Sequence, residues 1–189
     1  MNLYLFIMDS IIVHSNHNYE NLLCYKKAVV IYDLTYHFCM RYVDVKSRTF
    51  DQMIQAARSG KQNIVEGTVD MSSSYEMMLK LINVARGSLK ELLEDYKDYL
   101  RVNKLRLWQS DSKEVDAMRR VGIDNTESEY FLKLAETRND EVVANMVIVL
   151  LYQADVLLMR YIRHIEAEFA EHGGIKERMY AVRTQNRGY

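Results

Sequence analysis

The stretch "MLKLINVARGSLKELLEDYKDY", residues 78–99, decides the fold because its apolar side chains recur at helical spacing. The apolar positions are Met78, Ile82, Ala85, Leu89, Leu92, Tyr96 and Tyr99. Steps that alternate between three and four residues, about 3.5 on average, place such a set on one side of a helix, as in the seam of a bundle. The stretch therefore predicts a long helix that packs against other helices.

Three further stretches repeat this spacing. The stripes are Tyr25, Val29, Tyr32, Tyr36, Cys39 and Val43; then Phe50, Ile54, Ala57, Lys61, Ile64 and Thr68; and last Val143, Val147, Leu150, Ala154, Leu157 and Tyr161. We therefore expect long helices near 20–43, 47–69, 73–101 and 139–172. The fold class is all-α, an antiparallel up-and-down four-helix bundle.

The helix ends carry their own signals. Ser73 with Glu76, and Thr126 with Glu129, have the spacing of a capping box, and Asn139 can start the last long helix. Gly173 and Gly174 can end that helix.

The chain divides into three parts. They are an N-terminal extension over 1–18, the bundle over 19–172, and a basic C-terminal extension over 173–189 with helical character. Between the third and fourth long helices lies an insertion, about 103–137, with short helices around 113–120 and 126–136. We expect its apolar group, Leu105, Leu107 and Trp108, to fold back onto the bundle.

Composition narrows the class of protein. The 189 residues include no proline, only 7 glycines and 49% hydrophobic residues, which argues against a disordered chain or a β-sandwich. A formal charge of −1 indicates no general attraction to nucleic acid or anionic membranes. Cys24 and Cys39 are too far apart along one helix to bridge, so we expect reduced thiols and a cytoplasmic location. The longest apolar run, "MVIVLLY", is shorter than a membrane span, and we expect no membrane association.

The first and fourth long helices carry more apolar surface than one bundle seam needs. Cys24, Ala28, Ile31 and Phe38 flank the first stripe, and Met146, Val149, Val156 and Met159 flank the fourth. This surplus apolar surface must be covered by the insertion or by another copy of the chain. Because of the second possibility, we expect a homo-oligomer.

A second stretch, "AARSGKQNIVEG" at 56–67, contains two helical glycines. It is not a phosphate loop, because Gln62 follows Gly60-Lys61 where Ser or Thr is needed. Gly60 and Gly67 lie seven apart on one side of the helix, so a neighbouring helix can approach closely. Helix-packing candidates are Gly60, Gly67 and Ala57, with Ala85 and Ser88 of "ARGS" opposite. The polar residues Lys61, Asn63 and Glu66 either brace that neighbour or form a small ligand site.

These motifs resemble the four-helix-bundle family of 23S ribosomal RNA intervening-sequence proteins. The matching residues are Ala56-Ala57, Ser59, Asn63-Ile64-Val65-Glu66-Gly67, Ala85-Arg86-Gly87-Ser88 and Glu91-Leu92. Many members have Ser-Ile-Pro where this chain has Gly60-Lys61. The insertion and the ending "EHGGIKERMYAVR" resemble the four-helix bundle suffix-domain subgroup. The resemblance implies a non-catalytic, often self-associating bundle and transfers no catalytic residues; one relative in the wider family binds a reverse transcriptase and nucleic acid.

Chemistry-bearing residues are sparse. Glu168 and His172 lack metal-ligand partners on a facing helix, and Cys39 and His37 point apart, so we expect no metal, no cofactor and no catalytic residues. An enzyme or a metal-binding bundle is the alternative. Nucleic-acid-binding candidates are Lys176, Arg178, Arg183, Arg187, Arg160 and Arg163. The alternative to nucleic-acid binding is that the basic tail packs against the acidic surface of the bundle near Glu91 and Glu94. The sequence thus predicts a binding or assembly protein with a nucleic-acid or protein partner.

Overall fold

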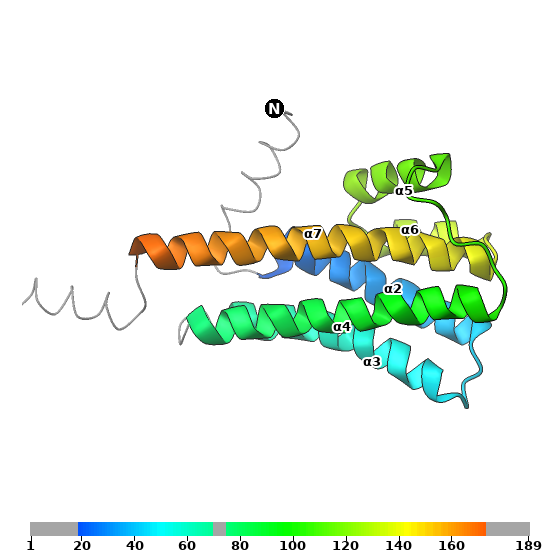
Figure 1. Cartoon of the computed structure of the whole chain (residues 1–189), viewed down its shortest axis with the longest axis horizontal. Coiled ribbons are helices and arrows are strands. Elements are labelled where there is room, and N and C mark those ends of the chain that lie inside the picture. The colour runs from blue at the N-terminus through cyan, green and yellow to red at the C-terminus, as the bar shows by residue number, and fades with distance from the viewer. Residues whose placement is uncertain (1–18, 70–74, 173–189) are drawn as a thin grey trace, which may run out of the picture.

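The computed structural model describes residues 19–69 and 75–172, and every regular element in these ranges is a helix (Figure 1). A 3-10 turn, η1 (Tyr19–Asn21), precedes α2 (Leu23–Tyr42), α3 (Arg48–Val69), α4 (Tyr75–Val102), α5 (Lys113–Asp124), α6 (Ser128–Glu136) and α7 (Asp140–His172). The predicted all-α class is confirmed. The predictions for 1–18, for the Ser73 cap, for Gly173-Gly174 and for the tail lie outside the described residues.

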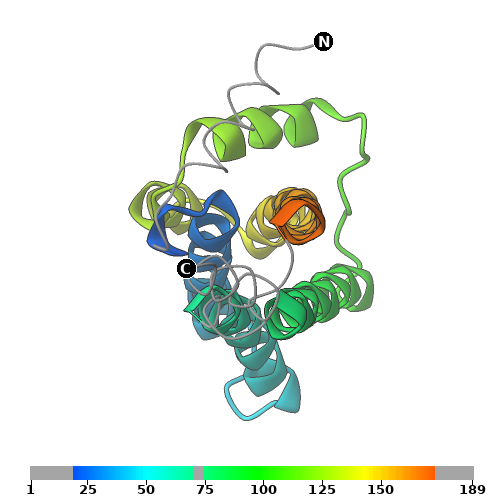
Figure 2. The ribbon, with the colours of Figure 1, turned by 90° about the vertical axis from the view of Figure 1, so that its left-hand side faces the viewer.

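Four long helices enclose the core. Helix α2 contacts α3 and α7, and α4 contacts the same two helices, so each long helix has two long neighbours. Figure 1 shows α2 and α4 running in one direction and α3 and α7 returning, and Figure 2 shows the four helices from the end. The predicted stripes of α4 and α7 face inward: Ile82, Leu92 and Tyr96 of α4 and Leu150 of α7 are fully buried.

The two helical glycines of α3 lie against α4. A methyl group added at Gly60 would meet Leu89 Cδ2 at 2.5 Å, and one added at Gly67 would meet Leu81 Cβ at 3.2 Å and Ile82 Cδ1 at 3.2 Å. The glycines therefore make room for bulky side chains of α4. Gly87 takes no part in this contact, because a methyl group added there would meet nothing within 4 Å.

The stripe predicted for the first helix is off-centre. Cys39 of that stripe is fully buried, but Tyr36 is 49% exposed and Tyr32 is half-buried. The flanking residues Ala28, Ile31 and Phe38 are fully buried. Helix α2 contacts α6 as well as α3 and α7, so its buried face is centred on those flanking residues. Tyrosine rings suit the edge of that face because the hydroxyl reaches water.

The caps of the last two helices differ from each other. The Thr126–Glu129 capping box is wrong: α6 is preceded by Glu127 without a side-chain cap, and Glu129 pairs with Lys133 at 2.7 Å. The chain begins helical geometry one residue later than that motif requires, so the Thr126 hydroxyl contacts the Glu127 carboxylate instead, at 3.2 Å. Asn139 caps α7 as predicted, since its Oδ1 accepts the Val142 N–H at 3.1 Å.

The insertion covers much of the surplus apolar surface. Helix α6 packs on α2 through the fully buried Phe131 and Ala135, and α5 packs on α7. Leu105 and Trp108 pack against the core as expected, but Leu107 stays 40% exposed. The insertion therefore belongs to the same packed body as the bundle.

Helix α7 is also the one described helix that is long and apolar enough to cross a membrane. In its most apolar window, 67% of the residues are buried inside the bundle. Core packing between α2, α4 and α5 accounts for this apolar character.

Candidate functional site

The polar residues of the α3 motif brace α4. The Ser59 and Ser88 hydroxyls lie 2.9 Å apart, and Asn63 Nδ2 donates to the Ser59 carbonyl oxygen at 2.9 Å and to its hydroxyl at 3.2 Å. The Lys61 ammonium lies 4.4 Å from the centre of the Tyr32 ring, and Glu66 is exposed. These contacts join α2, α3 and α4 and favour the bracing interpretation over a ligand site.

A second brace joins α4 to α7. Arg86 Nε donates to Asp155 Oδ1 at 2.5 Å, and Arg86 Nη2 donates to Asp155 Oδ2 at 3.3 Å, so the guanidinium is hydrogen-bonded to both carboxylate oxygens. This hydrogen bonding raises the pKa of Arg86 above its ordinary value. Such a paired geometry fixes the spacing of two helices.

The predicted basic residues do not gather into one described surface. Lys176, Arg178, Arg183 and Arg187 lie outside the described residues. Arg160 lines a pocket beside α7, whereas Arg163 is exposed and takes no part in that pocket.

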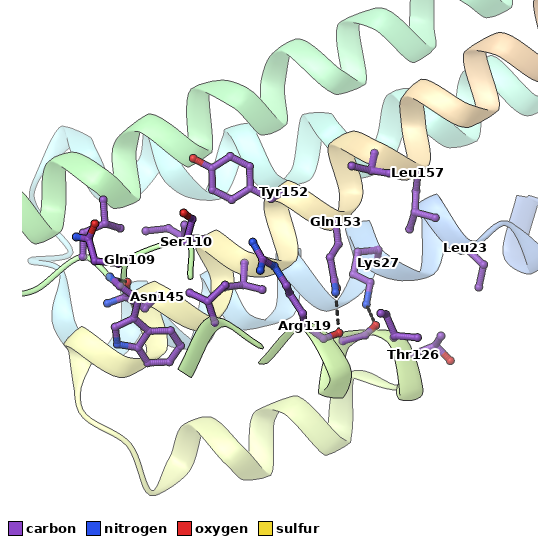
Figure 3. Close-up of a pocket in the computed structure, with 18 of the residues that line it drawn as sticks. Leu23, Lys27, Gln109, Ser110, Arg119, Thr126, Asn145, Tyr152, Gln153 and Leu157 are labelled. Atoms are coloured by element: carbon purple, nitrogen blue, oxygen red, sulfur yellow. Dashed lines mark hydrogen bonds between the residues drawn. The ribbon is translucent and has the colours of Figure 1, made fainter. Parts of the chain in front are cut away.

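A large concave site lies between α7, α5, the start of α2 and the segment that joins α4 to α5 (Figure 3). Its volume is about 890 Å³, and most of its wall is apolar, with Ile148 and Val149 of α7 among the lining residues. The pocket is open to solvent, since the lining residues Tyr152 and Val156 are 52% and 49% exposed.

Asn145 forms one wall by holding the segment 103–112, which we call the strap. Its Oδ1 accepts the Trp108 N–H at 2.8 Å, and its Nδ2 donates to the carbonyl oxygens of Arg106 and Glu141, each at 2.8 Å. The Glu141 carboxylate also accepts the Arg106 N–H at 2.8 Å. Asn145 is 1% exposed, and this buried amide uses both N–H donors and its carbonyl oxygen, with two of the three bonds fastening the strap.

Lys27 lies at the opposite end of the pocket and is 3% exposed. Its ammonium donates to the carbonyl oxygen of Gly122 and lies 5.7 Å from the centre of the Phe131 ring. Burial lowers the pKa of Lys27 to about 8 from its ordinary 10.5. No carboxylate among the described residues forms an ion pair with it.

Gly122 permits this arrangement. A methyl group there would lie 2.2 Å from Gln153 Oε1 and 3.0 Å from Leu150 Cδ2. Gln153 Nε2 donates to the Arg119 carbonyl oxygen at 2.9 Å, which fastens α5 to α7. Gln153 Oε1 is buried without a hydrogen-bond partner among the described residues.

The described residues offer little for metal or thiol chemistry. They contain no group of three His, Cys, Asp or Glu side chains placed to hold a metal ion. Cys24 and Cys39 are buried free thiols, and burial raises the pKa of each to about 12. A thiol that stays protonated is a poor nucleophile.

Sequence reasoning missed Lys27, Asn145, Gly122 and Gln153 as site residues. The available signal was weak but real: Lys27 lies on the apolar side of its helix beside Ala28, and Asn145 interrupts the apolar run of α7. A polar residue at a position with core spacing indicates either an exposed turn or a buried hydrogen-bonding role.

We also compared the chain with known proteins. No protein-family model, no curated protein and no solved structure matches it.

Proposed function

We propose that the protein is a non-catalytic binding protein whose ligand site is the pocket between α7 and the insertion. The observation that carries this proposal is the open pocket of about 890 Å³ with an apolar wall and a few convergent polar side chains. Ligand sites in proteins have this character and volumes of roughly 300–1,000 Å³. A bundle that serves only as a rigid spacer needs no such opening.

The resemblance to the 23S ribosomal RNA intervening-sequence family supports the same proposal. Membership would make the protein a non-catalytic bundle that assembles with itself or with a partner. The free thiols of Cys24 and Cys39 support a cytoplasmic location as part of the proposal. Light scattering on the purified chain tests self-association directly.

An enzyme is the competing proposal, and Lys27 is the residue it would use. A lysine whose pKa is lowered by burial is a feature of catalytic sites. The described pocket lining, however, supplies no Asp, Glu, His or Cys to accompany Lys27. The Lys27 ammonium donates to the Gly122 carbonyl oxygen, and no hydrogen bond joins it to the lining hydroxyls of Ser110 or Thr126. The lack of a base paired with a nucleophile among the described residues favours binding over catalysis.

The test uses a neutral, environment-sensitive dye such as Nile red. We expect its fluorescence to rise with the folded protein and to fall sharply in Val156→Trp, because an indole at that lining position fills the pocket. Val84→Trp is the matched control, since Val84 is a 44% exposed valine on α4 outside the pocket. Equal dye binding by both variants would refute the proposed site.

A further inference from the structure

The charged side chains that line the pocket in the described part of the chain all have one sign. They are Lys27 of α2, Arg119 of α5 and Arg160 of α7, and no Asp or Glu of the described residues joins them. Arg119 already pairs with Asp116 at 3.1 Å, whereas Lys27 and Arg160 form no ion pair among the described residues. The pocket therefore favours an anion over a cation or a neutral molecule.

Lys27 is the cation with most to gain from a ligand. A buried ammonium that has lost its water needs a compensating charge, and a backbone carbonyl and a ring face compensate only in part. Its 3% exposure means that a partner reaches it only from within the pocket. A slender ligand fits this requirement, and a folded protein surface does not.

The pocket also dictates the shape of the ligand. Figure 3 shows Lys27 and Thr126 at one end and Gln109 and Asn145 at the other. The stretch of α7 from Asn145 to Leu157 passes along the pocket and contributes the apolar lining residues Ile148, Val149 and Val156. A ligand that meets Lys27 must therefore lay an apolar body along α7.

We propose that the pocket binds an amphipathic carboxylate, such as a fatty acid, with its carboxylate at Lys27 and its chain along α7. This inference rests on the proposed binding function and names the chemical class of the ligand. The carboxylate supplies the charge that Lys27 lacks, and the chain covers the open apolar wall.

The experiment compares three ligands that share one chain and differ in head group: laurate, lauryl alcohol and the lauryltrimethylammonium ion. Each is titrated calorimetrically below its micelle-forming concentration. We expect laurate to bind roughly tenfold or more tightly than the alcohol, because hydrogen bonds to charged groups are the stronger ones, and the cation to bind most weakly.

Lys27→Met removes the charge while keeping an unbranched side chain. It should weaken laurate binding roughly to the level of the alcohol and leave the alcohol unchanged. Lys26→Met, the neighbouring lysine of α2 outside the pocket lining, is the matched control and should change neither.

Should Lys27→Met fail to fold, the unaltered protein provides the same test. Laurate affinity should fall as the pH rises through about 8, where Lys27 loses its proton, while alcohol affinity stays constant. The other charged groups that line the pocket are Arg119 from α5 and Arg160 from α7, and the contact from α6 is the uncharged Phe131.

The outcomes separate the two proposals. Equal affinity for laurate and alcohol, or tighter binding of the cation, would overturn the carboxylate inference and leave the pocket as an apolar binding site. Failure of all three ligands together with the neutral dye would overturn the proposed function itself.

Discussion

Asn145→Leu should loosen the strap and measurably destabilise the protein. The substitution removes the acceptor of the Trp108 N–H and the donor to the Arg106 carbonyl, two bonds of 2.8 Å. The third bond of Asn145, to the Glu141 carbonyl oxygen, matters less. Glu141 lies within α7, so a backbone N–H one turn later in the helix still donates to its carbonyl oxygen. Two backbone groups therefore lose their partners.

The magnitude follows from these two groups. A buried polar group left without its hydrogen bond costs about 1–3 kcal/mol. Trp108 is half-buried and Arg106 is exposed, so water recovers part of the loss and we expect about 2–4 kcal/mol in total. For a chain of this size that corresponds to a fall in melting temperature of roughly 4–16 °C.

Two measurements check this prediction. Thermal unfolding followed by circular dichroism gives the change in melting temperature. The emission of Trp108, the single tryptophan of the chain, should shift to longer wavelength as the strap leaves the core. Asn83→Leu is the control, because Asn83 is exposed and donates only to Leu79 of its own helix; it should stay within about 0.5 kcal/mol. An unchanged melt and emission in Asn145→Leu would refute the reasoning.

Three further predictions address the core, the buried lysine and the tail. Gly67→Leu should lower the melting temperature by several degrees, because even a methyl group there would lie 3.2 Å from side chains of α4. Gly87→Ala should instead raise the stability by about 1 kcal/mol, since the added methyl group meets nothing within 4 Å and alanine has the higher helix propensity. The opposite order of melting temperatures would contradict the placement of these two glycines. The pKa of Lys27 is lower in the folded chain than in the unfolded chain, so Lys27 itself contributes stability that grows as the pH rises from 8 to 10.5. The thiols of Cys24 and Cys39, whose pKa burial raises to about 12, contribute the opposite trend above pH 9 in the parent and in Lys27→Met alike. In urea unfolding across this range the parent should therefore gain stability relative to Lys27→Met, and parallel curves would count against it. If the basic tail at 173–189 contacts nucleic acid, filter retention of RNA should weaken steeply as salt rises, and retention independent of salt would reject backbone contact.

The sequence alone determined the helices and the contact between α3 and α4. A stripe such as Ile82, Leu89 and Tyr96 is a local property, because helix geometry converts spacing into direction without reference to the rest of the chain. Glycines inside a helix are similarly informative, since their unfavourable propensity needs a packing reason, and Gly60 and Gly67 do lie against α4.

Only the tertiary structure decided which face of α2 is buried and where the pocket lies. Two stripes of α2 have acceptable helical spacing, and the position of α6 selects the one that contains Phe38. Lys27 meets Gly122 across 95 positions of sequence, and Asn145 meets Trp108 across 37. A lysine or an asparagine has the same sequence appearance on a surface and in a core, because its burial is set by partners that only folding brings near.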